Sequence, residues 1–180
     1  MPRPCRVRLL LLDAYLVIAS KRDQRSYADR DIPQDVQERI LDAGRIAGSA
    51  QNRQPCRFLV LESAELRKRV AETVYAPENI RGARFAVAIV TPGGKSGFDA
   101  GRAAQNMMLA AWSEGITSCP NGMPDPDKTA ALLPLDGDER PLNILSFGYP
   151  ARARDPESRS PEEWIARAKR KPRDEIIRRL

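Results

Sequence analysis

Three cationic side chains, Lys21, Arg22 and Arg25, fall within five positions and follow an apolar run that is typical of a helix. A phosphate monoester carries nearly two negative charges and accepts many hydrogen bonds, so clustered Lys and Arg side chains bind it well. The alternative is a solvated helix end, because cations suit the negative end of the helix dipole. The segment therefore predicts either a phosphate site or a charged helix terminus.

A second polar segment, Gln51-Asn52-Arg53-Gln54-Pro55, follows one predicted helix later, with Ser49 just before it. Hydroxyl and amide side chains can donate to and accept from a heterocyclic ligand. The alternative is a polar loop whose side chains cap the preceding helix. Taken with the cations, this segment predicts a site for a phosphorylated, planar, electron-rich ligand.

Composition excludes several kinds of chemistry. Histidine is absent from the 180 residues, which removes Ser-His-Asp and Cys-His catalysis and the commonest zinc and iron ligand sets. The three cysteines, Cys5, Cys56 and Cys119, are isolated and show no metal-binding spacing and no disulfide framework. We therefore expect no metal and a reducing, cytoplasmic location.

The net charge of +6 and the pI near 9.5 leave a nucleic-acid-binding protein as a low-ranked alternative. Cations are spread along the chain apart from one dense run at 167–173, and aromatic residues make up only 6%. Stacking platforms for single strands are therefore scarce, and no recognised nucleic-acid motif accompanies the charge. We expect no nucleic-acid partner, and steeply salt-dependent association with DNA would favour the alternative.

A chain of this length predicts one domain with a real core. Hydrophobic patterning and capping residues predict helices and strands in a mixed order. The expected helices are 10–19, a helix from Pro33 to Gly48, a helix capped by Ser63, 97–114 and 125–133. The expected strands are 58–61, 85–90 and 142–147, and Pro120-Asn121-Gly122 is interpreted as a loop.

The two ends of the chain differ in character from the middle. Arginines before Leu9–Leu12 loosely imitate a signal peptide, but Asp13 interrupts the apolar run. We expect a possible disordered leader over residues 1–11 before the first helix, and no segment approaches the length of a membrane span. Residues 151–180 are basic and poor in apolar side chains, so we expect them to be disordered or to lie on another surface, and a partner subunit is the natural candidate.

Two nucleotide-binding motifs are missing. No G-x-G-x-x-G follows a strand, which argues against a Rossmann dinucleotide site. Gly93-Gly94-Lys95-Ser96 ends like a phosphate-binding P-loop but lacks the first glycine at the required distance. We interpret it as an ordinary loop.

Four segments in order, covering residues from about 12 to 150, resemble the FMN-dependent nitroreductase family. They are Lys21-Arg22-Asp23-Gln24-Arg25-x-Tyr27 with Ile32-Pro33, Ala47-Gly48-Ser49-x-x-Asn52-x-Gln54-Pro55-x-x-Phe58, Phe98-Asp99-Ala100-Gly101 with Gly115-Ile116-x-Ser118-Cys119, and Ser146-Phe147-Gly148-Tyr149-Pro150. The resemblance implies an α+β fold, in which helices sandwich a central, mostly antiparallel sheet. It also implies an intertwined homodimer with FMN at the interface, so that 12–150 is the flavin-binding domain and 151–180 an extension on the partner.

The same resemblance implies roles for individual residues. Lys21 and Arg22 would hold the FMN phosphate beside Asp23, and Arg25 would lie near the N1 and O2 edge of the flavin. Ser49, Asn52 and Gln54 would approach the flavin, and the Ser49–Asn52 stretch would reach it from the other subunit. Pro120, Asn121 and Gly122 would bring a backbone amide to flavin N5, and Arg170 and Lys171 would add cations at the phosphate.

The implied activity is that of an oxidoreductase in which NAD(P)H delivers a hydride to flavin N5. A nitroaromatic, quinone or related acceptor then takes the electrons in a ping-pong sequence, and no side chain is assigned a catalytic role, because the flavin carries the chemistry. The chain departs from the family pattern, with Asp23 for Ser, Gly48 for Pro, Cys56 for Trp and a short C-terminus. These departures motivate the alternative of a flavin-binding or regulatory relative without turnover.

Overall fold

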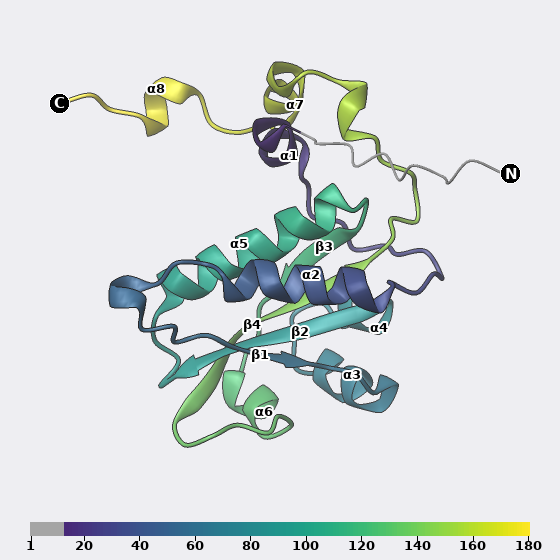
Figure 1. The fold of residues 1–180 in the computed structure, drawn as a ribbon, viewed down its shortest axis with the longest axis vertical. Helices are drawn as coiled ribbons and strands as arrows, with labels where there is room; N and C mark the ends of the chain where they lie inside the picture. The colour runs from purple at the N-terminus through teal and green to yellow at the C-terminus, as the bar shows by residue number, and fades with distance from the viewer. Residues whose placement is uncertain (1–12) are drawn as a thin grey trace, which may run out of the picture. The chain divides into compact units, whose positions relative to one another are not determined.

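A computed structural model describes residues 13–180 of the chain (Figure 1). The possible leader at 1–11 and the start of the first predicted helix fall outside the described residues. The described chain forms two compact units, one that joins the segment up to Lys21 with Asp155–Leu180 and one formed by Arg22–Arg154.

The larger unit is built on one four-stranded sheet. Its strands are β1 (Arg57–Val60), β2 (Phe85–Pro92), β3 (Thr117–Asn121) and β4 (Glu139–Gly148). They lie in the order β1-β2-β4-β3, and every neighbouring pair is antiparallel. The strands expected at 58–61, 85–90 and 142–147 are confirmed as β1, β2 and β4.

Helices cover both faces of this sheet (Figure 1). Helices α2 (Gln34–Arg45) and α5 (Gly97–Ser113) lie on one face, and α3 (Ala64–Ala71) and α6 (Pro126–Ala130) on the other. Strand β2 is buried on both sides: Phe85, Val87 and Ile89 join the core under α2 and α5, and its alternate residues join the other core. The predicted α+β fold with a sandwiched, antiparallel sheet is confirmed.

Capping residues set the helix starts much as the sequence predicts. The Ser63 hydroxyl accepts from Leu66 N at 3.0 Å and starts α3, and the Asp125 carboxylate accepts from Asp127 N at 3.1 Å and starts α6. Helix α2 ends at Arg45, before the predicted stop at Gly48. The short helix α4 (Glu78–Arg81) was not anticipated.

Strand β3 corrects the interpretation of Pro120-Asn121-Gly122 as a loop. Pro120 and Asn121 belong to the strand and pair with Leu145 and Ile144 of β4. Proline has no N–H to give to a second neighbour, but β3 lies at the sheet edge, where that loss is tolerated. Only Gly122 of the three lies beyond the strand.

The smaller unit contains α1 (Ala14–Ser20), α7 (Pro161–Arg167) and α8 (Arg173–Ile176), with a 3₁₀ turn at Pro156–Ser158. Helix α1 packs against α7, and the Trp164 indole is buried and donates to Pro156 O at 2.8 Å. Part of the C-terminal extension therefore lies on the first helix of its own chain. Its expected packing on a partner stays a prediction.

One close approach in the larger unit requires glycine. A Cβ placed on Gly148, the last residue of β4, would lie 2.7 Å from Tyr27 Cδ1 and 2.8 Å from Tyr27 Cβ and Cγ. Such separations are below van der Waals contact, and Cβ and Cγ of Tyr27 cannot swing away as the end of a flexible side chain would. The ring of Tyr27 therefore rests against bare backbone at the end of β4.

We expect Gly148→Ala to lower the free energy of unfolding by about 1–3 kcal/mol, the usual cost of overpacking a filled site. Urea unfolding followed by circular dichroism measures this. Gly101→Ala is the matched control, since nothing lies within 4 Å of a Cβ there and alanine favours the interior of α5. Equal stability of the two variants would contradict the proposed contact.

Candidate functional site

Backbone hydrogen bonds fix the cationic segment across one end of the sheet. Gln24 N donates to Ser118 O at 3.2 Å, near the start of β3, and Ala28 N donates to Tyr149 O at 2.8 Å, just past the end of β4. Because β3 and β4 are antiparallel, these two points share one end of the sheet. Residues 24–28, which include Arg25, are therefore held against the sheet at both ends.

The side chain of Tyr27 adds a third attachment. Its hydroxyl lies 2.9 Å from Ser146 Oγ and 3.3 Å from Ser146 O. Burial raises the pKa of the Tyr27 phenol well above its ordinary value, so the phenol stays neutral and serves as an anchor.

A cavity of about 240 Å³ opens beside this segment. The residues that line it are Arg25, Tyr75, Ala76, Asn79, Pro120, Asn121 and Gly122. Four of the site residues expected from sequence thus lie around one cavity. They are Arg25 of the cationic segment and Pro120, Asn121 and Gly122 at the end of β3.

The other residues of the first cationic segment are placed as follows. Lys21 closes α1, with its N–H donating to Val17 O at 3.0 Å. Lys21 and Arg22 are half-buried, and Asp23 is exposed. Their predicted part in holding a phosphate stays a prediction.

A buried amide network supports the end of β3 at this cavity. Asn79 Nδ2 donates to Asn121 Oδ1 at 2.9 Å, and Asn121 Nδ2 lies 3.0 Å from Cys119 O and 2.9 Å from Ile144 O. The same amide nitrogen is 3.0 Å from Ser146 Oγ. The Asn121 side chain is therefore committed to the interior, and this residue could meet a ligand only through its backbone.

The backbone amide of Asn121 is also engaged, since it donates to Asn143 Oδ1 at 3.1 Å. The next amide along the chain belongs to Gly122, which lines the cavity. A residue with a Cβ at 122 would meet the Tyr75 ring at 3.4 Å. That distance is an ordinary van der Waals contact, so the Tyr75 ring lies close against the main chain where it borders the cavity.

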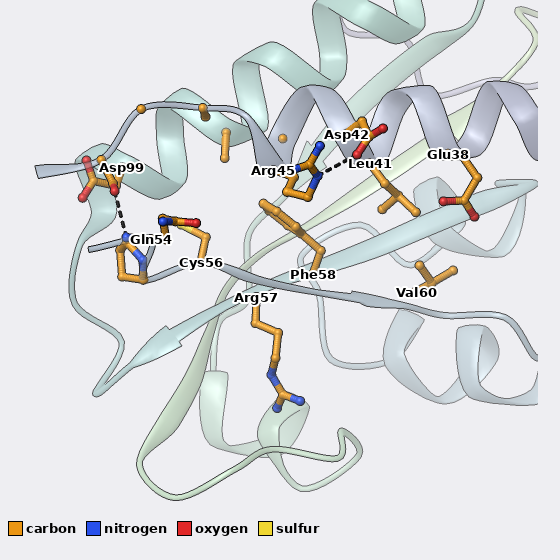
Figure 2. Close-up of a pocket in the computed structure, with 16 residues that line it drawn as sticks. Glu38, Leu41, Asp42, Arg45, Gln54, Cys56, Arg57, Phe58, Val60 and Asp99 are labelled. Atoms are coloured by element: carbon orange, nitrogen blue, oxygen red, sulfur yellow. Dashed lines mark hydrogen bonds and ion pairs between the residues drawn. The ribbon is translucent and has the colours of Figure 1, made fainter. Parts of the chain in front are cut away.

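Ser49 and Gln54 line a different pocket, of about 420 Å³, shown in Figure 2. It lies between α2, β1 and the start of α5, with Leu41, Phe58 and Val60 on its apolar side. Arg57 points away from α2 in this view, and its Nε donates to Glu139 Oε1 at 2.9 Å.

The loop that carries Ser49, Asn52 and Gln54 has an unusual backbone. Gln51, Asn52 and Gln54 all have φ between 51° and 53°, a left-handed region that non-glycine residues seldom adopt. Ser49 Oγ accepts from Gln54 N at 2.8 Å, which holds the loop together internally. Its amide side chains remain exposed, and strained backbone of this kind concentrates at functional sites.

The two pockets lie at opposite edges of the sheet. Asn121 pairs with Ile144, Ile144 with Ala88, and Ala88 with Leu59 of β1. Three strand spacings of about 4.8 Å separate the two ends of this row by ~14 Å. One chain therefore does not bring Arg25 and the Ser49–Gln54 loop around a single small ligand.

Arg170 and Lys171 lie in the smaller unit between α7 and α8 and are exposed. Their predicted contribution to a phosphate site is not tested by their position and stays a prediction. Cys56 lines the α2–β1 pocket, and burial, with the nearby Asp99 carboxylate, raises the pKa of its thiol. A reactive thiolate is disfavoured there, in agreement with a packing role.

Several polar atoms near the cationic segment lack partners in the described part of the chain. They are Gln24 Nε2, Thr117 Oγ1 and Ser118 Oγ. Gln24 and Ser118 are joined by a backbone hydrogen bond. Two of the unpaired side-chain donors therefore extend from neighbouring backbone segments. Unpaired buried donors beside cations fit an anionic, oxygen-rich ligand better than an apolar one. Within residues 13–180, no group of His, Cys, Asp or Glu side chains is arranged to hold a metal ion.

Fold and site together define an α+β protein with a cationic, backbone-lined cavity at the sheet edge. The Nitroreductase family model matches residues 18–92 and 95–149. The chain belongs to the Nitroreductase family. No helix of residues 13–180 combines the length and apolar character needed to cross a membrane.

Individual proteins that are similar to this chain carry nitroreductase names as well. A protein of Archaeoglobus fulgidus, provisionally named NADH dehydrogenase/NAD(P)H nitroreductase, is 30% identical over 150 residues, 77% of this chain and 86% of that protein. A crystal structure of a nitroreductase family protein from Clostridium difficile is 26% identical, with a TM-score of 0.77, and covers 93% of this chain and 98% of that one. A structure described as an FMN-dependent nitroreductase, also from C. difficile, shares the fold at 19% identity and a TM-score of 0.70, covering 82% and 95%.

Sequence reasoning missed three residues of the cavity, Tyr75, Ala76 and Asn79. They lie between and on the short helices α3 and α4, a stretch that predicts no strong element. Pro77, two residues after Tyr75, was the available signal that this stretch forms a loop. The buried Asn79 had no signal, because its partner, Asn121, is 42 positions away.

We expect Asn121→Ala to lower the free energy of unfolding by about 2–4 kcal/mol. The change removes the acceptor of Asn79 Nδ2 and an amide donor to Ile144 O, and it opens a small cavity. Thermal and urea unfolding measure the loss. Asn106→Ala, an exposed position on α5, is the control and should stay within about 0.5 kcal/mol of the wild type. If Asn121→Ala lowered the free energy of unfolding as little as Asn106→Ala, the amide network would not stabilise the fold.

Proposed function

We propose that this protein is an FMN-dependent oxidoreductase of the nitroreductase type. The observation that carries the proposal is the cavity in which Arg25 lies with Pro120, Asn121 and Gly122. A nearby guanidinium would stabilise the negative charge that reduction places on the flavin edge, and a close main chain would supply a backbone amide. Family membership and an FMN-dependent neighbour of the same fold support the choice of cofactor.

In this proposal Lys21 and Arg22 hold the phosphate of FMN, and Gln24 and Ser118 supply further donors beside it. Arg170 and Lys171 of the extension add positive charge. Asp23 lies next in sequence to Arg22, so its negative charge opposes the phosphate and weakens binding unless the neighbouring cations compensate it.

Arg25 is the electrostatic residue of the site. Reduction of a flavin places negative charge on its N1 and O2 edge, and a guanidinium held nearby stabilises that charge. Tyr27 and Gln24 fix the backbone on either side of Arg25, which keeps this residue at the edge of the cavity.

We propose a homodimer, because residues of the site lie at both edges of the sheet. The Ser49–Gln54 loop, which cannot share the Arg25 cavity within one chain, would approach the flavin held by the other chain. The exposed side chains of Ile176, Ile177 and Leu180 support an extension that covers part of a partner.

When bound, FMN would supply hydride acceptance from NAD(P)H and electron delivery to a nitroaromatic, quinone or related acceptor, in a ping-pong sequence. The protein residues bind, orient and stabilise charge and none acts as a general acid. We place this activity in the cytoplasm, since the three cysteines are isolated in the sequence and form no disulfide framework there.

The test is an anaerobic absorption spectrum of the purified protein with FMN, before and after addition of NADH or NADPH. We expect a bound flavin spectrum that bleaches with a nicotinamide and recovers with an acceptor. A protein that binds flavin but is not reduced by either nicotinamide would favour the relative without turnover. A protein that ignores FMN would overturn the proposed function.

The variant Arg22→Ala tests whether Arg22 binds the phosphate of FMN rather than its ring system. We expect the Kd for FMN to rise about ten- to a hundredfold, the range for losing a charge-assisted hydrogen bond. The Kd for riboflavin, which has no phosphate, should change less than about twofold. Fluorescence titration measures both.

Arg69→Ala is the matched control, because Arg69 is an exposed arginine on α3 and its loss changes net charge equally. An equal rise for FMN and riboflavin in Arg22→Ala would place Arg22 away from the phosphate.

A further inference from the structure

Strand β4 is irregular just before the point where it meets the end of β3. The register of its pairing with β2 shifts there, so that Leu142 is an extra residue on β4, a β-bulge. A bulge changes the direction of the side chains beside it. Asn143 follows this bulge, is half-buried, and immediately precedes Ile144, the residue that pairs with Asn121 of β3.

The side chain of Asn143 holds the main chain of β3. Its Oδ1 accepts from Asn121 N at 3.1 Å. In the opposite direction, Asn121 Nδ2 donates to Ile144 O of β4 at 2.9 Å. Side chains from both strands therefore fix the last residue of β3 against β4.

The peptide unit between Asn121 and Gly122 lies between two hydrogen-bonded units. The unit before it is held through Asn121 N by Asn143. The unit after it is held through Gly122 O, which accepts from Tyr75 N at 3.1 Å. Because each peptide unit is planar, the middle unit is oriented only by rotation about bonds at the Cα atoms of Asn121 and Gly122. Fixing both flanking units restricts those rotations.

The middle peptide unit carries a donor that the protein does not use. The Gly122 N–H has no acceptor within residues 13–180, and Gly122 lines the 240 Å³ cavity together with Arg25. Backbone donors are strong hydrogen-bonding groups, so an unused one beside a cavity favours a ligand that presents an acceptor there. An oxidised flavin fits this requirement, because its N5 is an acceptor at the ring edge.

We propose that Asn143 is a positioning residue for the cofactor. By accepting from Asn121 N it keeps the Gly122 N–H directed into the cavity, and it thereby makes the site prefer a flavin over a 5-deazaflavin, which carries C–H in place of N5. This inference rests on the proposed function, since that function places a flavin in the Arg25 cavity. It adds a residue that does not itself line the cavity and a basis for the choice between two classes of cofactor.

The test compares the Kd of the full-length protein for FMN and for 5-deaza-FMN, both measured by calorimetry without turnover. The two ligands share the phosphate and the ribityl chain and differ in the acceptor at position 5. We expect the wild type to bind FMN about three- to tenfold more tightly, the range for one neutral hydrogen bond. Asn143→Ala should reduce this ratio to less than about twofold.

The ratio of the two Kd values separates positioning from a general structural effect. A loosened fold weakens both ligands alike and leaves the ratio unchanged. Asn143→Asp should keep the wild-type ratio, because a carboxylate oxygen remains as the acceptor and its charge acts equally on both ligands. Asn106→Ala, at an exposed position on α5, is the matched control and should also keep the ratio.

Each remaining outcome has a definite meaning. A wild type that binds the two ligands equally, while its bound FMN is reduced by a nicotinamide, overturns the inference and leaves the proposed function standing. An Asn143→Ala variant with the wild-type ratio does the same. If Asn143→Ala does not fold, Asn143→Leu, which preserves the volume and removes the acceptor, gives the same comparison. A wild type that binds neither ligand overturns the proposed function and the inference with it.

Discussion

The structure of the site depends on one buried contact, the ring of Tyr27 against the bare backbone of Gly148. An aromatic ring is costly to expose, and a buried phenol also needs a polar partner for its hydroxyl. Gly148 leaves room for the ring, and the Tyr27 hydroxyl lies 2.9 Å from Oγ of Ser146, two residues earlier on the same strand. Together they tie the segment with Arg22 and Arg25 to the end of β4, so positive charge stays where a ligand can meet it.

Ser146 also links this segment to the other wall of the cavity. Its Oγ lies within 3.0 Å of both the Tyr27 hydroxyl and Asn121 Nδ2. The cationic segment and the end of β3 are therefore positioned by one residue of the central sheet rather than by two independent loops. A cavity supported in this way is preorganised, because its charged side and its main-chain side cannot shift separately.

Sequence predicts the parts of this molecule that depend on local rules. Apolar runs predict three of the four strands, and Ser63 and Asp125 cap helices as expected. Strand β3 escaped prediction because Pro120 reads as a strand breaker until the strand is known to lie at an edge. The site residues were found as short polar segments. The family resemblance already implied that the Ser49 segment serves the other subunit, but the residues alone did not separate the two cavities, because their separation depends on the sheet order β1-β2-β4-β3, which long-range pairing sets.

That division has a physical consequence for assembly. The row from Asn121 to Leu59 crosses four hydrogen-bonded strands, and β1 and β3 are the two outer strands of this sheet. Motion of side chains does not span ~14 Å. The Ser49–Gln54 loop nevertheless holds three non-glycine residues in a left-handed backbone, which costs on the order of 1 kcal/mol or more for each. We infer that this geometry serves a ligand outside its own chain, and a second copy is the molecule that carries the matching cations.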